Sequence, residues 1–390
     1  MPVVRVILLL VGSATALIPI RRVPGWIPAL LLAVLATATG VIPWHLARGA
    51  AGDLGPALAF LVVAVPLAVE LDDTGFFAVL AARAGAGRHL LPTLWLLAAA
   101  TTIVFNLDAA VVLLTPLYVR IAVRQGLDVV HLAVVPALLA SLASSVLPVS
   151  NLTNLIAVSR LDLSTSGFVT HLAAPSALAI VVGGWLHLRA APRATRATAA
   201  MDTPEAAGSL RIGVAVVAWL LAGFTLGDHW GVPAWVVAAA ALAALMVRRR
   251  SLPWRHLPVG AAGLALGLGL LAAGAAPHLP VERVIGLGGR GGIAATVAAT
   301  AVAANAVNNL PALLVTLPAL DARPDRVWAV LAGVNLGPTL WVTGALSTML
   351  WQATMQRLGH QVSATTYARY GARVGLPALA VAMVVLVIAG

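Results

Sequence analysis

The chain has 390 residues, of which 61% are hydrophobic and only 9% are charged, with a formal net charge of +11 at pH 7. A soluble globular domain carries about 25% charged residues, so this composition excludes an ordinary soluble protein. Apolar runs of roughly 20 residues, the length that crosses a bilayer, follow one another along the chain. The sequence therefore predicts an all-α polytopic membrane protein.

Two residue types are missing, and their absence removes several kinds of chemistry. The chain has no Cys and no Lys, so all 24 basic residues are Arg. No disulfide, thiolate metal site or Cys nucleophile can form, and no Walker loop with its phosphate-binding Lys is present. The Arg residues stand in short loops between apolar runs, which argues against nucleic-acid binding. The nine His residues show no metal-ligand spacing, so neither a metal nor a cofactor is predicted.

Apolar spans and interruptions follow the same order in two halves of the chain. The first half has spans at 3–20, 25–43, 56–80 and 172–189, with a polar-tipped segment at 91–121 and a broken span at 129–160. The second half has spans at 211–226, 232–247, 257–276 and 373–389, with a polar-tipped segment at 292–318 and a broken span at 326–356. We therefore expect a first repeat at 1–190, a polar linker at 191–210 and a second repeat at 211–390.

The number of crossings predicts that the two repeats are inverted. Each has about five transmembrane helices plus a re-entrant hairpin and a broken helix, and the hairpin returns to the side from which it starts. An odd number of crossings inserts the second half upside down relative to the first, as in many secondary transporters. A trace of duplication supports this, because Asp108 stands seven residues before Thr115 and Asn309 seven residues before Thr316.

The placement of Arg predicts the orientation. The face that carries the linker has 17 of the Arg residues and the opposite face has 7. The positive-inside rule then makes the linker cytoplasmic and both termini external, in the inner (plasma) membrane. No signal-peptide cleavage pattern follows the first span, so this span is expected to remain as a helix.

Four stretches place polar side chains inside otherwise apolar segments. Those of the first half are Asn106 and Asp108, then Ser150, Asn151, Thr153 and Asn154; those of the second half are Asn308 and Asn309, then Asn335 and Thr339. Pro, Gly and Asn open a helix there, and the freed backbone groups are tolerated only around a cavity. The alternative is a set of Pro kinks with Ser and Asn hydrogen-bonding between helices. Four breaks at matching places favour a mid-membrane binding site.

Asp108 is the sharpest functional candidate among these residues. Inserting a carboxylate at the centre of a membrane helix costs a free energy on the order of 2.5–3.5 kcal/mol, so such a residue usually marks a functional site. We predict that Asp108 takes up a proton or coordinates substrate, with a helix cap as the structural alternative. Glu70, Asp72 and Asp73 form a second acidic cluster late in the third span, either a proton relay or an interfacial cluster paired with Arg83.

Two other chemistries have weaker support. The segment Gly286–Gly291 has the spacing of a dinucleotide-binding loop, but no strand precedes it, so we interpret it as a flexible lead-in to the second hairpin. A membrane-embedded lipid-linked transferase would use an acidic pair such as Asp72 and Asp73 beside a phosphate-binding cation. That function gives no reason for two matching halves, so the chain is not expected to be an enzyme.

Six stretches carry a resemblance to a known family. They are Asp73–Phe77, Phe105–Ala110 with Leu114–Pro116, Leu147–Leu155, Asn308–Pro311, Asn335–Pro338 and the tail from Gly344 to Tyr367. At these residues the chain resembles the arsenite/antimonite efflux permeases of the ion transporter superfamily, over nearly its whole length. One departure is Leu107, which separates Asn106 from Asp108 where many relatives have Asn directly before the Asp.

The resemblance implies a transporter that exports arsenite and antimonite by alternating access, either in exchange for protons or with a separate cytoplasmic ATPase subunit. The wider superfamily also moves dicarboxylates, citrate, silicate and sodium ions, so these stay as alternatives. The residue chemistry agrees with a neutral trihydroxide such as arsenous acid, whose hydroxyls both donate to and accept from Asn, Ser and Thr. An anionic dicarboxylate favours Arg in the site, or sodium beside helix N-termini, and no Arg stands at the four breaks.

Overall fold

The computed structural model describes residues 2–17, 23–83, 89–191, 206–250 and 254–390. Within these ranges the chain forms helices and no strand, so the all-α prediction is confirmed. Five of the described helices are long and apolar enough to cross a bilayer. Most of the linker predicted at 191–210 lies outside the described residues, as do some of the Arg residues counted for the orientation, such as Arg21 and Arg22.

The helices fall into two runs, one on each side of the polar stretch. Before it they are α1 (Pro2–Leu17), α2 (Trp26–Ala38), α3 (Trp44–Asp72), α4 (Phe76–Arg83), α5 (Leu90–Phe105), α6 (Leu107–Gln125), α7 (Val129–Leu142), α8 (Leu152–Leu161) and α9 (Thr165–Arg189). After it they are α10 (Ala206–His229), α11 (Ala234–Arg249), α12 (Val259–Ala275), α13 (Glu282–Ile285), α14 (Gly289–Val307), α15 (Asn309–Ala322), α16 (Val327–Leu336), α17 (Leu346–Arg357), α18 (Ala364–Tyr370) and α19 (Leu376–Ala389).

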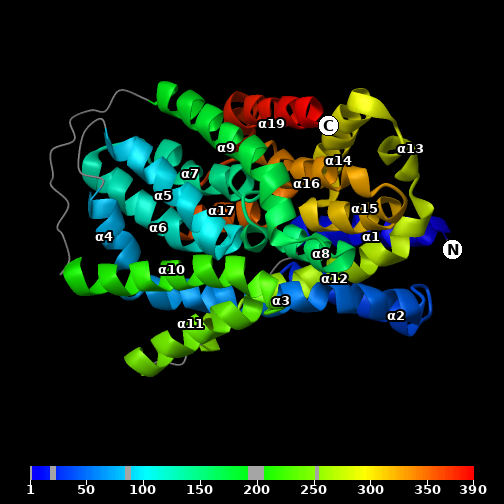
Figure 1. The fold of residues 1–390 in the computed structure, drawn as a ribbon, viewed down its shortest axis with the longest axis horizontal. Helices are drawn as coiled ribbons and strands as arrows, with labels where there is room; N and C mark the ends of the chain where they lie inside the picture. Colours follow the sequence, from blue (N-terminus) through cyan, green and yellow to red (C-terminus); the bar gives the residue numbers. More distant parts are fainter. Residues whose placement is uncertain (1, 18–22, 84–88, 192–205, 251–253) are drawn as a thin grey trace.

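Two pairs of helices fold back on themselves at a single residue. Asn106 is the only residue between α5 and α6, and the Tyr118 hydroxyl donates to the Leu94 carbonyl, each twelve residues from Asn106. This cross-link shows that α5 and α6 run antiparallel as a hairpin. Asn308 separates α14 from α15 in the same way, and these two helices also pack together. In Figure 1 the α5–α6 hairpin lies toward the left end of the molecule and the α14–α15 hairpin toward the right end.

Each hairpin is followed by a helix that is broken midway. Between α7 and α8 the chain makes a short 3-10 turn at Pro148–Ser150, and Asn151 is then extended before α8 begins. Between α16 and α17 it makes 3-10 turns at Gly337–Thr339 and Val342–Gly344, and Ala345 is then extended before α17 begins. The breaks stand where Pro, Gly and polar residues interrupt the apolar run, because these residues do not continue a helical ladder.

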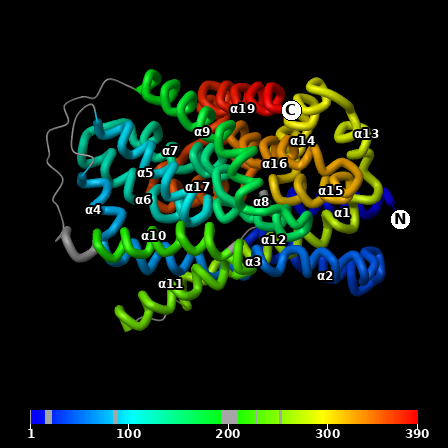
Figure 2. Tube along the Cα trace, in the orientation of Figure 1, coloured from blue at the N-terminus to red at the C-terminus, as the bar shows by residue number. Residues whose placement is uncertain are grey.

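The two halves pack on each other with reciprocal helix contacts. α2 lies on α12 and α3 lies on α11, while α3 also contacts α12. α9 and α19 lie side by side along the upper edge of Figure 1, and the chain trace in Figure 2 shows the same arrangement. In Figure 1 the hairpins and broken helices lie between this upper pair and the layer formed by α2 and α3.

Three span boundaries, two of α3 and one of α9, differ from the sequence prediction. α3 begins at Trp44 rather than near residue 56, and it continues through a Gly-rich stretch and Pro56. The early part is helical because it packs on α12, which buries Leu54 completely. α3 also ends sooner than predicted, at Asp72, before a turn in which Gly75 takes a φ of +85°. α9 begins seven residues early, at Thr165, because the Ser164 hydroxyl accepts a capping hydrogen bond.

Candidate functional site

The tip of each hairpin is an Asn in a backbone conformation that favours glycine. Asn106 has φ +119° and ψ +151°, and Asn308 has φ +83° and ψ +152°. For a residue with a side chain this region costs of order 1–3 kcal/mol and is found mainly where function requires it. Each Asn side chain offsets part of that cost by accepting a hydrogen bond from the backbone N–H two residues later, at Asp108 and at Leu310. Both hairpin tips are thus formed by an Asn that caps the helix following it.

The two tips and the first broken helix meet around a small cavity, which we name the central cavity. Its volume is about 30 Å³, enough for ordered water. Its polar lining comes from three elements and consists of Asp108, Asn151, Thr153, Asn308 and Asn309. The apolar lining comes from α3, α12 and the start of α17, together with Leu107, Leu152 and Leu310 beside the polar residues. Five of the predicted site residues, far apart in the sequence, therefore share one cavity.

Asp108 is the only ionisable residue among the described residues that line the central cavity. Its side chain is 7% exposed, and Oδ1 is buried without a hydrogen-bond partner. A buried polar atom without a partner is costly, so an unpaired carboxylate oxygen on a residue that lines a cavity marks a place for a proton, water or polar solute. Asp108 also lies in the first turn of α6, where the helix dipole stabilises negative charge.

Asn335, near the end of α16, connects the second half to the polar residues of the first. Its Oδ1 accepts from Nδ2 of Asn151 at 3.0 Å and from Oγ1 of Thr153 at 2.7 Å. Its Nδ2 donates to Oδ1 of Asn154 at 2.6 Å and to Oγ of Ser145 at 2.9 Å. Asn335 thus holds two residues of the central cavity wall from behind, in a fully hydrogen-bonded network. The sequence prediction missed Ser145, which stands in an ordinary Ala-Ser-Ser run.

Three further predicted binding residues, Asn106, Ser150 and Asn154, do not line the central cavity, although each is next in the chain to a residue that does. Asn106 is completely buried at the tip, and the hydroxyl of Ser150 donates to the Ile103 carbonyl at 2.9 Å. Asn154 donates to the Ser144 carbonyl at 2.6 Å. These bonds anchor the first break to its neighbours.

The second break is anchored in a comparable manner. The hydroxyl of Thr339 donates to the Leu336 carbonyl at 2.7 Å, within the break itself. Asn305 bridges α14 to the break by donating to the Gly337 carbonyl at 2.8 Å, and the Thr343 hydroxyl donates to the Asn305 carbonyl at 3.2 Å. Asn305 belongs to the polar stretch recognised in the sequence, about one turn before the hairpin tip, but it is not among the predicted binding residues.

The structure does not bring Asp72 and Asp73 to the central cavity. Leu61 on the same helix lines the cavity, and Asp73 follows it by a helical distance of about 18 Å. Asp73 is exposed and pairs with Arg249 of α11 at 3.3 Å rather than with Arg83. Arg249 also pairs with Glu70 at 2.8 Å. The acidic cluster therefore joins α3 to α11 at the end of the helix.

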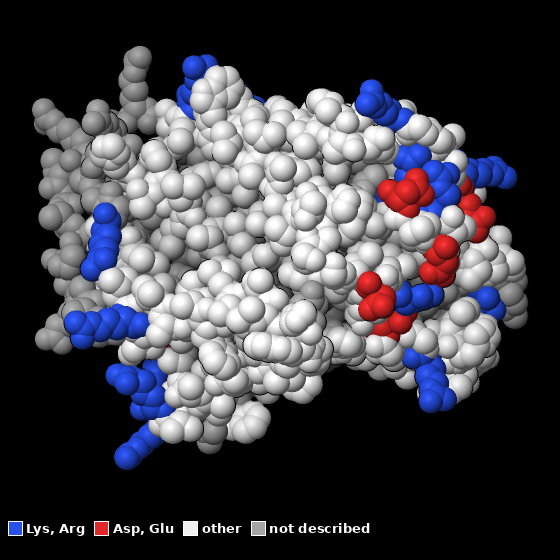
Figure 3. Space-filling model, in the orientation of Figure 1, with Lys and Arg blue, Asp and Glu red and all other residues white. Residues whose placement is uncertain are grey.

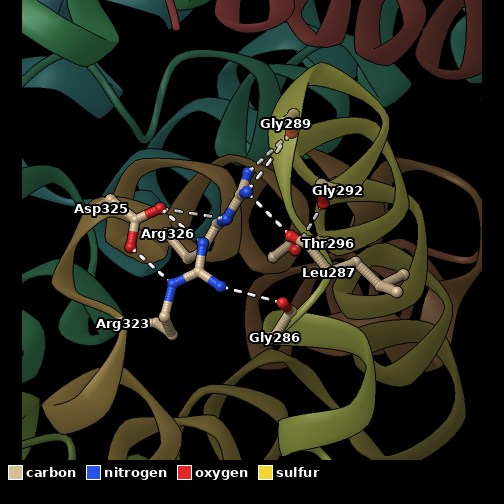
Figure 4. A network of polar contacts seen from close by, with 8 residues as sticks. All are labelled: Gly286, Leu287, Gly289, Gly292, Thr296, Arg323, Asp325 and Arg326. Atoms are coloured by element: carbon tan, nitrogen blue, oxygen red, sulfur yellow. Dashed lines mark hydrogen bonds and ion pairs between the residues drawn. The ribbon is translucent and has the colours of Figure 1, made fainter.

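Two arginines close the base of the second hairpin (Figure 4). Arg326, which is 3% exposed, donates to the carbonyl of Leu287 at 2.8 Å. Arg323 donates to the carbonyl of Gly286 at 2.9 Å, and the carboxylate of Asp325 pairs with both guanidinium groups. The segment interpreted from the sequence as a flexible lead-in is thus hydrogen-bonded to the far end of the hairpin.

A stack of buried rings lies between α5, α7 and α9, apart from the cavity. His131 and His187 are parallel at 4.0 Å between ring centroids, and Trp95 stacks on the other side of His187 at 5.3 Å. None of these rings lines the central cavity. The sequence held no signal for this pair, because the two histidines are 56 residues apart and belong to different spans.

Comparison with known proteins links this architecture to transport across membranes. A family model described as citrate transporter matches residues 15–346. A protein of Yersinia enterocolitica named arsenical pump membrane protein is 26% identical, over 93% of this chain and 92% of that relative. A protein of the same name from Escherichia coli K12 is 27% identical, with the same coverage. The resemblance found from the six stretches is therefore confirmed.

One solved structure shows the same fold over the whole chain. The crystal structure of the YdaH transporter of Alcanivorax borkumensis superimposes with a TM-score of 0.60, over 99% of this chain and 96% of that one. The sequence identity is 17%, so this likeness speaks for the fold alone. It covers both hairpins and both broken helices.

Proposed function

The chain belongs to the citrate transporter family of membrane proteins, and from this premise we propose that it exports arsenite and antimonite from the cytoplasm in exchange for protons. The observation that carries the proposal is the central cavity, in which uncharged Asn and Thr side chains surround one buried carboxylate. The curated relatives named arsenical pump membrane protein support the choice of substrate.

The cavity suits a small neutral solute. Arsenous acid presents hydroxyl groups that donate and accept, and Asn and Thr side chains offer both functions in return. The two hairpin tips add the N-terminal ends of α6 and α15, whose first backbone N–H groups have no partner within the helix. The network around Asn335 holds the cavity-lining side chains of Asn151 and Thr153 in place.

Citrate, which the family description names, fits the cavity less well. A tricarboxylate carries several negative charges that need cations, and the described residues lining the cavity include no Arg and no His. Asp108 would repel such an anion at close range. Transport of citrate, a dicarboxylate, silicate or sodium is the second candidate, and a vesicle transport experiment separates these solutes.

We assign the proton-coupling step to Asp108. Its Oδ1 has no hydrogen-bond partner, so this atom is available to hold a proton when the cavity is empty of substrate. A protonated carboxyl removes the charge from a membrane-embedded site, which lowers the energy of the state without substrate. Uptake of a proton from outside as substrate leaves, followed by its release inside, would couple export to the proton gradient. Asp72 and Asp73 take no part in this step.

We further propose that the halves 1–190 and 211–390 are inverted repeats that move relative to each other. The repeated order of hairpin, Asn tip and broken helix supports this, as do the reciprocal contacts of α2 with α12 and of α3 with α11. On the face drawn in Figure 3, acidic residues gather with Arg at the right end, whereas the left end shows mainly Arg. The positive-inside rule supports a cytoplasmic left end and external termini.

The test is arsenite uptake into everted membrane vesicles that contain the protein, with and without an imposed proton gradient and without ATP. We expect gradient-driven uptake that Asp108→Asn abolishes. Asp162→Asn is the matched control, because Asp162 ends α8 in a left-handed conformation that Asn adopts readily, away from the cavity lining. Uptake that requires ATP and a soluble subunit would refute proton exchange. Transport of citrate or sodium without arsenite would refute the substrate.

A further inference from the structure

A second cavity lies in line with the central cavity, toward the end of the molecule that we propose to be external. We name it the external vestibule; it has a volume of about 270 Å³ and is lined by α3, α8, α12 and α15. Its polar lining consists of His45, Asp53 and Arg160. It is large enough to hold a small solute with its hydration water.

Three helices, α3, α12 and α15, form a wall of both cavities. On α15, Leu310 lines the central cavity and Leu314 and Leu317 line the vestibule, at the spacing of one helix face. On α3, Leu61 and Asp53 line the two cavities, with buried Ala57 between them. Because one face of each helix passes from the first cavity to the second, the two cavities lie along a single path.

An apolar plug separates the two cavities. A Cβ on Gly269 of α12 would clash with Cδ1 of Leu54 and lie 3.4 Å from Cδ1 of Leu314. Because Gly269 has no side chain, the side chains of Leu54 and Leu314 fill the space beside it. On α12 this position lies between Leu268, which lines the central cavity, and Ala273, which lines the vestibule. Leu54 is completely buried and Leu314 is 6% exposed, so no polar group of this layer is offered to a solute.

Beyond the plug, an ion-pair bridge spans the vestibule. Arg160, at the end of α8, pairs with Asp53 of α3 at 3.6 Å and with Asp321 of α15 at 3.2 Å. The side chains are partly exposed, so the two ion pairs are weak and do not form a permanent lock. Through these two ion pairs, Arg160 links α15 of the second hairpin to α3 on the other side of the path.

We propose that substrate leaves the central cavity between α3, α12 and α15, and that the Leu54–Leu314 plug and the Arg160 bridge together form the external gate. This inference rests on the proposed function, because it assigns a direction to the path. Opening requires α15 to move away from α3, which separates the two leucines and breaks the bridge. A bridge of two weak ion pairs closes the gate without preventing repeated opening.

The gate can be tested by cysteine accessibility, since the natural chain contains no Cys. Ala273→Cys places a thiol in the vestibule and Ala265→Cys places one in the central cavity. A membrane-impermeant thiosulfonate reagent is added to right-side-out vesicles. We expect rapid labelling at position 273 and slow labelling at 265, and we expect Arg160→Gln or Leu314→Ala to speed the latter by about tenfold.

Two matched controls and three outcomes decide the result. Arg323→Gln and Leu313→Ala change an external Arg and a buried leucine of α15 that line neither cavity, and they should leave labelling at position 265 unchanged. Unchanged labelling at 265 in Arg160→Gln and Leu314→Ala, with normal labelling at 273 as proof of folding, would overturn the gate. Labelling at 273 only in everted vesicles would overturn the direction.

The labelling experiment is independent of the substrate. If the gate variants behave as expected but the vesicles transport no arsenite, the proposed substrate fails and the gate stands. If arsenite transport is present and the gate variants do not change labelling, the proposed function stands and the gate fails. The two proposals therefore fail separately.

Discussion

Asn335 of α16 donates a hydrogen bond of 2.6 Å from its side-chain amide to the side-chain oxygen of Asn154 on α8. The two residues come from the two broken helices, one in each half of the chain. The same Asn335 side chain bonds to Asn151 and Thr153, which line the central cavity. One amide therefore ties the second half to the part of the central cavity wall that the first half provides.

Replacing Asn335 by Ala should abolish transport and destabilise the protein. The change leaves the buried polar atoms of its partners without hydrogen bonds, each at a cost of about 1–3 kcal/mol. We expect a lower melting temperature in detergent and no arsenite uptake. The conservative variant Asn335→Gln keeps an amide and should recover part of the stability; equal losses in both variants would argue against the network.

The hairpin tip at Asn308 should accept Gly and reject Ala. Gly adopts a φ of +83° freely, whereas Ala is strained at this φ. Ala also has no side-chain oxygen to accept the hydrogen bond from the Leu310 N–H. We expect Asn308→Gly to keep most of the thermal stability and Asn308→Ala to lose at least about 1 kcal/mol more. A measurement in which Ala is as stable as Gly would show that the tip has another conformation.

The contact between α3 and α11 should depend on Arg249 and not on its neighbour. Glu70 is 3% exposed and pairs with Arg249 at 2.8 Å. Removal of the guanidinium takes away the positive charge that stabilises this buried carboxylate. We expect Arg249→Ala to lower the melting temperature clearly. Arg248, which is exposed, is the control, and Arg248→Ala should change the melting temperature little. Similar values for both variants would place the strength of this contact elsewhere.

Asp325 should contribute to stability at neutral pH and lose that contribution in acid. Hydrogen bonds from the Arg323 guanidinium hold the pKa of the Asp325 carboxyl below its usual value. A group with a lowered folded-state pKa stabilises above its unfolded value of about 3.9 and loses the effect as the pH falls below it. Asp325→Asn should therefore lower the melting temperature at pH 7, with a gap to wild type that narrows as the pH falls below about 4. A constant gap would contradict the assignment.

Local features of the chain predicted much of the fold. The lengths of the apolar runs determine helices that span a bilayer, and Asn106, Asn308 and the Pro148 break stand where the helices end. These features depend on residues close in sequence. The start of α3 was missed for the opposite reason, since its Gly-rich stretch is helical only because α12 packs against it.

The sequence by itself determined the membrane class, the helical content and the positions of the four polar breaks, because apolar length and helix-breaking residues act within a few positions of themselves. Only the tertiary structure decided which polar residues meet. Asn151 and Asn335 are 184 residues apart, and Asp72 lies outside the cavity lining although it shares α3 with Leu61. Such neighbours arise from packing between halves, and the bonds of Arg160 and Asn335 across that packing leave no local pattern in the chain.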